Sequence, residues 1–203
     1  MDGVYLIDND SSPGIVSTVA GLSRFLDDLE GLLIHPPSLY IDLEGENLGC
    51  TLRDILESLD IPKVFFDVRN NSDALYSHYT VRLAGVQDLQ LMELATRTFG
   101  RKCVNRLARC IERDASLSFR ESQRWKRCKE KGVLLFAPER GGELSNVHFL
   151  PRLWKLYDSK LEQAWRARVS KATSERVVES QSSRYVPHGQ HKALAPKGWI
   201  SLR

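Results

Sequence analysis

A short apolar segment that ends in two carboxylates, residues 38–45, limits the fold more than any other part of the sequence. It reads Ser-Leu-Tyr-Ile-Asp-Leu-Glu-Gly, and its hydrophobic residues predict a strand over Leu39–Leu43. Side chains alternate along a strand, so Asp42 and Glu44 are expected on the same face. Two carboxylates held this close repel each other, which favours a shared divalent cation, although an acidic strand end without a metal also fits the pattern.

A second strand followed by an acidic residue is predicted further along the chain. Lys63–Phe66 is predicted as a strand that is buried from Val64 onward, and the asparagines of the next turn stand where residues cap helices. The helix predicted over Ser72–His78 carries Asp73 in its first turn. A third carboxylate therefore comes just after a second strand.

Five segments of the chain together resemble a known family. The first two are similar to the first and second exonuclease motifs of the DEDD 3′-to-5′ exonucleases, in the branch that contains RNase D and the Werner-type domains. The others resemble the strand and helix after the second motif, the approach to the third motif, and the helix beyond it. In chain order the segments are LYIDLEG (39–45), KVFFDVRNNSDALYSHY (63–79), GVQDLQLMELATR (85–97), LFAPERGG (135–142) and FLPRLWKLYDSKL (149–161).

This resemblance implies an α/β fold, an RNase H-like mixed sheet flanked by helices, and a site for Mg²⁺ or Mn²⁺. In a two-metal phosphodiester hydrolysis, one ion lowers the pKa of the attacking water and the other stabilises the leaving oxygen. By resemblance, Asp42 bridges the two ions, Glu44 holds the ion on the side of the nucleophile, and Asp73 reaches the other ion.

The sequence departs from the family pattern directly after the first motif. The family has two further strands between the Asp-x-Glu strand and the first helix. Here only residues 45–50 separate Glu44 from the helix predicted over Thr51–Leu59, which is too short for two strands of ordinary length. The sheet is therefore expected to be truncated and to lack a strand pair.

A second departure affects the third motif, where the family has a Tyr or His and, four residues later, an Asp just before the Leu-Pro-x-Leu-Trp segment. Counting back from Leu150, the Asp position falls on Asn146 and the Tyr position on Gly142. An amide cannot replace an anionic metal ligand. We therefore expect that at most one ion is held, weakly, and that hydrolysis is impaired.

Two acidic residues are candidates for the missing ligand. Glu143 lies close to the third motif in the sequence, and Asp88 ends a strand predicted over Val86–Leu89. Each has a simpler interpretation, because Glu143 fits a solvated loop and Asp88 fits an N-cap of the helix predicted over Leu89–Phe99.

The positive charge is concentrated in the second part of the chain. The net charge is +3, yet residues 1–60 hold two basic and twelve acidic residues, and the remainder holds 27 basic and 14 acidic ones. This distribution favours a nucleic acid as the partner and does not favour a membrane. The resemblance to the exonucleases implies that the nucleic acid is bound at a single-stranded 3′ end. The candidate phosphate contacts lie on a basic helix predicted after Gly100: Arg101, Lys102, Arg106, Arg109 and Arg113.

The remaining sequence is consistent with one exonuclease-like domain over residues 1–179. Val4–Ile7 is predicted as a strand, and Ser12 is predicted to cap a helix that continues to Leu29. A single long helix is predicted from Pro151 to Val178, followed by a flexible, poorly packed basic tail over residues 180–203. No apolar run reaches about 18 residues and the start does not resemble a signal peptide, which indicates an intracellular protein of the cytoplasm or nucleus.

Three interpretations remain open at this point. The first is an impaired metal-dependent exonuclease, and the second is a non-catalytic module that binds nucleic acid or protein on an exonuclease fold. The third is an imperfect gene model that omits two segments of an intact enzyme, which sequencing of the transcript across Gly49–Cys50 and Gly142–Glu143 would reveal. Nothing in the sequence distinguishes RNA from DNA.

Overall fold

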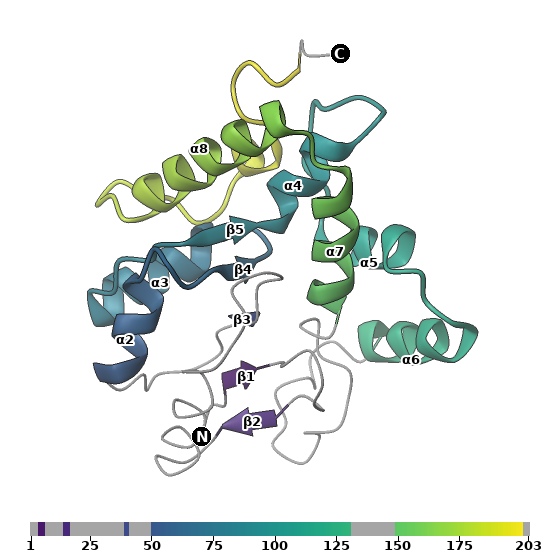
Figure 1. Cartoon of the computed structure of the whole chain (residues 1–203), viewed down its shortest axis with the longest axis horizontal. Helices are drawn as coiled ribbons and strands as arrows, with labels where there is room; N and C mark the ends of the chain where they lie inside the picture. Colours follow the sequence, from purple (N-terminus) through teal and green to yellow (C-terminus); the bar gives the residue numbers. More distant parts are fainter. Residues whose placement is uncertain (1–3, 7–13, 17–38, 41–49, 131–148, 201–203) are drawn as a thin grey trace.

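A small parallel sheet lies at the centre of the molecule (Figure 1). The computed structural model describes residues 4–6, 14–16, 39–40, 50–130 and 149–200. The sheet has the strand order β3-β4-β5, with Leu39 opposite Lys63 and Lys63 opposite Val86. Its strands are β3 (Leu39–Tyr40), β4 (Lys63–Phe65) and β5 (Val86–Asp88). A separate antiparallel pair is formed by β1 (Val4–Leu6) and β2 (Gly14–Val16).

Strand β4 is buried on both faces, as expected for the central strand of a parallel sheet. Val64 belongs to one hydrophobic cluster and Phe65 to another, because successive side chains point to opposite sides. Gly85 sets the start of β5, since its φ is +61° and an added Cβ would lie 2.7 Å from the carbonyl oxygen of Ile61. The sheet therefore separates two cores.

Helices cover the sheet on both sides (Figure 1). Helix α8 packs along β5 and against α3 and α4, while α7 packs against α4 and α5. The helices after the first strands are α2 (Cys50–Glu57), α3 (Arg69–Tyr79), α4 (Leu89–Thr96), α5 (Leu107–Asp114) and α6 (Phe119–Glu130). The C-terminal part contains α7 (Leu150–Lys160), α8 (Gln163–Ser180) and a short 3₁₀ helix η3 (Gln190–Ala193).

The predicted strands at 63–66 and 86–89 agree with the structure to within a few residues, as do the helices that follow the three predicted strands. Of the strand predicted at 39–43, the described residues Leu39 and Tyr40 form β3. Helix α3 begins earlier than expected, at Arg69, with Val68 as its N-cap and no side-chain cap. The two asparagines, Asn70 and Asn71, therefore lie inside the helix, and Asp73 lies in its second turn. Residues 41–49, where the strand pair was expected to be missing, lie outside the described residues.

Three helix predictions were wrong in part. The basic helix predicted after Gly100 begins only at Leu107, so Arg101 and Lys102 lie in the loop before α5 and Arg106 is its N-cap. Residues 14–16 form strand β2 and not the first turn of the helix predicted after Ser12; Ser12, Pro13 and residues 17–29 lie outside the described range. The long C-terminal helix is two helices, because the chain turns at Leu161 and Glu162, which have extended backbone angles. Leu161 is buried in the core, and this turn returns α8 across the sheet.

The C-terminal segment differs from the expected poorly packed tail. It folds back beside α8 and reaches the loop after α4 (Figure 1). The amide of Val104 donates to the carbonyl of Ala193, and the amide of Ala195 donates to Lys102. Trp199 is only 5% exposed and meets the Trp165 ring edge-to-face at 5.0 Å between centroids. One distant aromatic contact thus orders a segment whose composition predicts disorder.

Candidate functional site

The carboxyl ends of the three parallel strands meet at one edge of the sheet, which is where ligands bind in open α/β folds. Asp67 follows β4 by two residues, and Asp88 is the last residue of β5. Asp42 and Glu44 follow β3 in the sequence, but both lie outside the described residues, as does Glu143. The structure therefore brings together acidic residues at two of the three strand ends.

Asp88 is fully buried and has its hydrogen-bonding capacity filled by four donors. Its Oδ1 accepts from the amides of Gln90 and Asp67, each at 3.0 Å, and its Oδ2 accepts from the amide of Val68 at 3.4 Å. The fourth donor is the guanidinium of Arg176, 2.6 Å from Oδ2. Asp88 is thus the N-cap of α4, the simpler of its two interpretations. An ionised carboxylate offers about four lone-pair sites, which leaves little capacity for a metal.

Asp67 is held in place by two arginines. Its carboxylate accepts a bidentate pair of hydrogen bonds from Arg69, at 2.6 and 2.7 Å, and Arg176 lies 3.7 Å away. Burial by itself would raise the pKa of Asp67, but the hydrogen bonds and positive charges of Arg69 and Arg176 outweigh it and lower the pKa. Asp67 also adopts a left-handed backbone with φ of 60°, which turns the chain from β4 into α3.

Asp73 lies half-buried on α3 beside the C-terminal segment. The hydroxyl of Ser77 donates to its Oδ1 at 3.2 Å. Tyr185 covers the same helix and donates to Oδ1 of Asn70 at 2.7 Å. Burial, and the negative charges of Asp67 and Asp73, raise the pKa of Tyr185 to about 12, although the positive charge of Arg69 opposes this shift.

The predicted metal ligands fit Mg²⁺ or Mn²⁺ in their chemistry, since these ions prefer carboxylate oxygens. Of the three, the described part of the chain contains only Asp73. Among the described residues its carboxylate accepts a hydrogen bond from the Ser77 hydroxyl and forms no ion pair with an arginine, so it is not neutralised in the way that Asp67 and Asp88 are. The convergence of Asp42, Glu44 and Asp73 stays a prediction.

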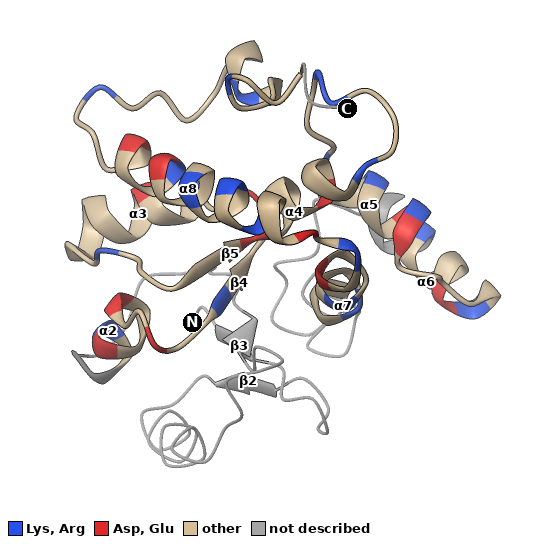
Figure 2. Ribbon diagram, turned by 45° about the horizontal axis from the view of Figure 1, so that its top comes forward, with Lys and Arg blue, Asp and Glu red and all other residues tan. Residues whose placement is uncertain are grey.

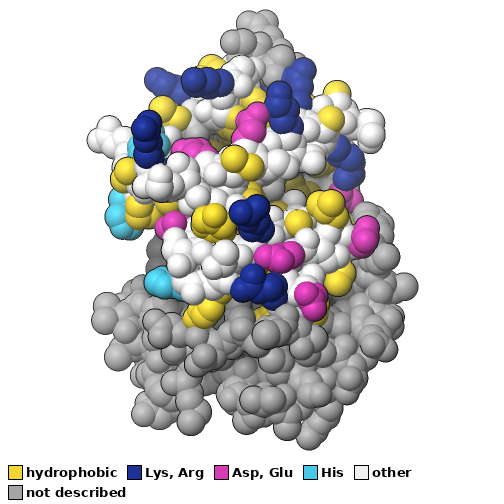
Figure 3. All heavy atoms as spheres, turned by 90° about the vertical axis from the view of Figure 1, so that its left-hand side faces the viewer, with side chains coloured by type: hydrophobic (Ala, Val, Ile, Leu, Met, Phe, Trp, Pro, Cys, Tyr) yellow, Lys and Arg dark blue, Asp and Glu magenta, His cyan; other side chains and the backbone are white. Residues whose placement is uncertain are grey.

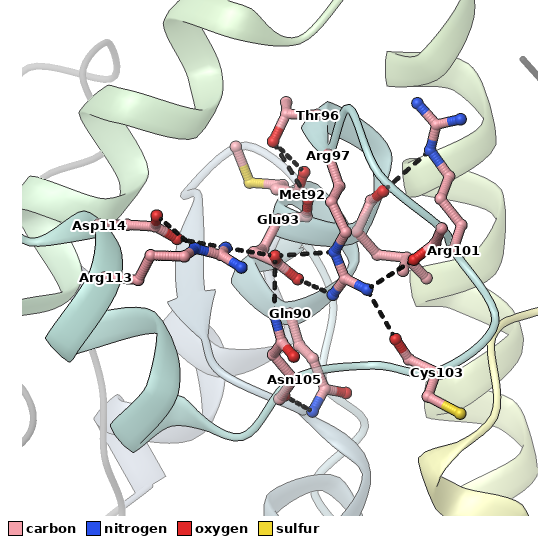
Figure 4. A network of polar contacts seen from close by, with 12 residues as sticks. Gln90, Met92, Glu93, Thr96, Arg97, Arg101, Cys103, Asn105, Arg113 and Asp114 are labelled. Atoms are coloured by element: carbon pink, nitrogen blue, oxygen red, sulfur yellow. Dashed lines mark hydrogen bonds and ion pairs between the residues drawn. The ribbon is translucent and has the colours of Figure 1, made fainter.

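A different group of possible ligands lies between α4 and α5, and sequence reasoning missed it. Atoms of Glu93, Cys110 and Asp114 all lie within 4.8 Å of one another. Glu93 is 1% exposed and accepts from Arg97, from Nδ2 of Asn105 at 3.1 Å, and from Arg113 at 2.6 Å (Figure 4). A glutamate inside the apolar run LQLMELA was the signal in the sequence.

This group does not suit a divalent cation. The charge of Glu93 is already compensated by two arginines, and Asp114 accepts from Arg113 and from the Tyr157 hydroxyl at 2.7 Å. Burial, together with the charge of Glu93, raises the pKa of Cys110 to about 12, so its thiol is neutral. We interpret the group as a buried ion-pair network that joins α4, α5 and α7.

The five predicted phosphate contacts separate into two groups. Lys102, Arg106 and Arg109 are exposed. Arg101 donates to the carbonyls of Leu94 and Ala95, and Arg113 belongs to the Glu93 network. The first three are therefore available to a ligand, whereas the guanidinium of Arg113 has a structural role.

Basic residues appear on α5, on α8 and near the C-terminus (Figure 2). The face on the left-hand side of Figure 1 carries basic, acidic and apolar side chains in a mixed pattern (Figure 3). Among the described residues of that face no continuous basic patch is visible. Within the described ranges, no helix is both long and apolar enough to cross a bilayer.

No known protein-family profile matches the chain, and no curated protein sequence matches it significantly. Its fold is similar to that of RNase D from Trypanosoma brucei. The structure of that enzyme in complex with RNA U12 has a TM-score of 0.55 and 18% identity, covering 74% of this chain and 54% of that chain. A second structure of this RNase D has a TM-score of 0.53 and 19% identity, covering 74% of this chain and 56% of that chain. Its GMP complex has a TM-score of 0.51 and 18% identity, covering 74% of this chain and 49% of that chain. The chain thus spans about half the length of these RNase D chains, and the likeness establishes the fold.

Proposed function

We propose that this protein binds the single-stranded 3′ end of a nucleic acid on an exonuclease fold of the DEDD type, and that its metal-dependent hydrolysis is impaired. The observation that carries the proposal is the similarity of the fold to an RNase D structure in complex with RNA. The order of the motif-like segments over residues 39–161 supports the same assignment independently. Such a partner places the protein in the cytoplasm or nucleus.

Asp42, Glu44 and Asp73 are the residues that would hold Mg²⁺ or Mn²⁺ in this proposal. The bound ion would supply a water of lowered pKa and stabilise the charge that develops on the phosphate. The chain itself must then bind the strand, exclude competing water and present the last phosphodiester to the carboxylates. Exposed basic residues near α5, Lys102, Arg106 and Arg109, would hold the phosphate backbone.

Impairment follows from the absence of the third-motif side chains. Asn146 and Gly142 stand at the positions of the family's Asp and Tyr. Of the two possible substitutes, Asp88 already has four donors on its carboxylate, which leaves Glu143 as the remaining candidate ligand. Positioned acid-base assistance is worth about 10²- to 10⁴-fold in rate, so hydrolysis should be slower by at least this factor.

A non-catalytic binding module is the second candidate function. The ion pair between Asp88 and Arg176 favours this candidate. Because the charge of Asp88 is neutralised by Arg176, the carboxyl end of β5 does not offer a carboxylate to a metal ion. If the module binds nucleic acid, the two candidates differ only in turnover; if it binds a protein instead, they also differ in nucleic-acid binding.

The test measures release of mononucleotides from a 3′-overhanging RNA or DNA strand in Mg²⁺ or Mn²⁺. The wild type is compared with Asp42→Ala and with Asp60→Ala, an exposed acidic residue that serves as the control. Slow release that Asp42→Ala abolishes supports an impaired enzyme, and binding without release supports the module. Vigorous release abolished by Asp42→Ala contradicts impairment, and release unaffected by that change indicates a contaminating nuclease.

A further inference from the structure

A pocket of about 500 Å³ opens beside the C-terminal end of α4, away from the strand ends. Its walls come from the last residues of α4, from the loop after it, from the end of α7 and the start of α8, and from Ile200. Asp88 caps the other end of α4, and an eight-residue helix spans about 12 Å. The pocket is therefore distinct from the predicted metal site. Its lining includes Arg97, Phe99, Arg101, Lys160, Glu162 and Trp165.

Two aromatic rings of this pocket are each flanked by two guanidinium groups. Phe99 is 51% exposed, and the guanidinium carbons of Arg97 and Arg113 lie 4.9 and 5.2 Å from its ring centroid. The Trp165 ring has Arg101 at 4.8 Å and Arg168 at 5.2 Å. Each arginine lies within the distance at which a cation interacts favourably with an aromatic face.

The charged side chains in and beside the pocket carry a net positive charge. Arg97 is compensated by Glu93, which is buried behind it, so it contributes little net charge. Lys160 of the lining is exposed on α7, Arg168 is exposed on α8 beside the Trp165 ring, and Arg101 lies over the same ring, while Glu162 is the single acidic residue among the described lining residues. A pocket of this charge attracts an anionic ligand.

We propose that this pocket binds a segment of single-stranded nucleic acid, upstream of the end that the strand-end acids would receive. The inference rests on the proposed function and adds a second contact surface to it. Guanidinium groups and aromatic rings bind bases by stacking, and the same guanidinium groups hold phosphates. Lys160 and Arg168 contact phosphates, and Trp165 and Phe99 contact the bases.

The C-terminal segment contributes to the wall of the pocket. Trp199 packs against the edge of Trp165 and thereby holds that ring beside Arg101 and Arg168. Ile200, which is 61% exposed, then forms part of the wall. The tail thus completes a binding surface.

The test compares the double variant Lys160→Glu/Arg168→Glu with the matched control Lys155→Glu/Lys171→Glu. Both make the same charge change with one exposed residue on α7 and one on α8. Lys160 lines the pocket and Arg168 contacts the Trp165 ring of its wall, whereas neither control residue lines the pocket or contacts that ring. Binding of a fluorescein-labelled oligouridylate, and of oligodeoxythymidylate in parallel, is followed by anisotropy at several salt concentrations. Unchanged circular dichroism and melting temperature establish that all variants fold.

We expect the pocket variant to bind roughly tenfold more weakly at low salt, with a salt slope shallower by about 1.4, since each lost phosphate contact removes about 0.7. The control should bind within about twofold of the wild type. A pocket variant that binds like the wild type, or a control that weakens equally, would overturn the pocket assignment while the proposed function stands. A wild type that binds neither oligonucleotide would overturn both.

Tryptophan fluorescence provides a second test, which is specific for the Trp165 ring. Stacking of a base should quench tryptophan fluorescence, and Trp165→Phe should remove most of that quenching. Trp154→Phe should retain it, because Trp154 is a buried residue of α7 that does not line the pocket. Equal quenching in the wild type and Trp165→Phe would exclude base contact at this pocket even where the charge variants weaken binding.

Discussion

Arg176 of α8 donates to the buried carboxylate of Asp88 across 2.6 Å, and the two residues are 88 positions apart in the chain. This ion pair ties the C-terminal helix to the junction of β5 and α4. Arg176 is 7% exposed and Asp88 is fully buried, so neither charge is well solvated. Arg176→Met should therefore lower the free energy of unfolding by about 3–5 kcal/mol, because it leaves a buried carboxylate without its cation.

Urea unfolding followed by circular dichroism checks this prediction. Lys171→Met, an exposed change on the same helix, should alter the free energy of unfolding by less than about 0.5 kcal/mol. Equal stability of the Arg176→Met variant and this control would contradict a structural role for the pair.

The low pKa of Asp67 predicts a pH dependence of stability. Its folded-state pKa lies below the unfolded value of about 3.9, so its ion pairs stabilise the protein above that pH, and the contribution is lost as the pH falls through the folded pKa. Asp67→Asn should therefore be less stable than the wild type at neutral pH, and the difference should shrink as the pH falls below about 4. Urea unfolding at several pH values measures it, and a difference that is constant with pH would refute the assignment.

Metal binding tests the predicted carboxylate cluster directly. Isothermal titration with Mn²⁺ should detect binding to the wild type, and Asp42→Ala, Glu44→Ala and Asp73→Ala should each weaken it, because carboxylates that converge repel one another until a cation neutralises them. Asp60→Ala is the control. An isotherm that Asp42→Ala or Glu44→Ala leaves unchanged would show that the ligands were assigned wrongly.

The basic residues near α5 should separate into binding and structural groups. Arg106→Glu/Arg109→Glu should weaken single-strand binding and flatten its salt dependence without a change in melting temperature, since both side chains are exposed. Arg113→Met should instead lower stability, because Glu93 loses a partner at 2.6 Å in a buried site. Anisotropy and thermal melts on the same samples distinguish the two. If Arg113→Met weakened binding without destabilising the fold, its assignment to the Glu93 network would be wrong.

Trp199 of the C-terminal segment should contribute as much to the free energy of unfolding as a residue of the hydrophobic core. Trp199→Ala should destabilise the protein by about 3–5 kcal/mol, as expected for removal of a large buried aromatic side chain. The neighbouring change Ile200→Ala, at a residue 61% exposed, should cost little. Urea titrations of both variants give the comparison, and similar midpoints would mean that the segment is not held by its tryptophan.

Local pattern determined the strands, several helices and the candidate acidic residues of this protein. The apolar runs at Leu39, Lys63 and Val86 and the capping position of Asp88 depend on neighbours within a few residues, so hydrophobic periodicity and side-chain chemistry suffice to predict them. The assignment of Asn146 and Gly142 to the third-motif positions rests on counting back from Leu150; both residues lie outside the described ranges, so this assignment stays a prediction.

Only the tertiary structure decided which of these charges are available to a ligand. The sequence places Arg106 and Arg113 on one basic helix, yet the fold exposes the first and buries the partner of the second, Glu93. The packing of Trp199 against Trp165, like the pairing of Arg176 with Asp88, joins residues far apart in the chain. Composition and periodicity describe only near neighbours, whereas the free energy of burying a charge or a ring depends on which distant group the fold brings to it.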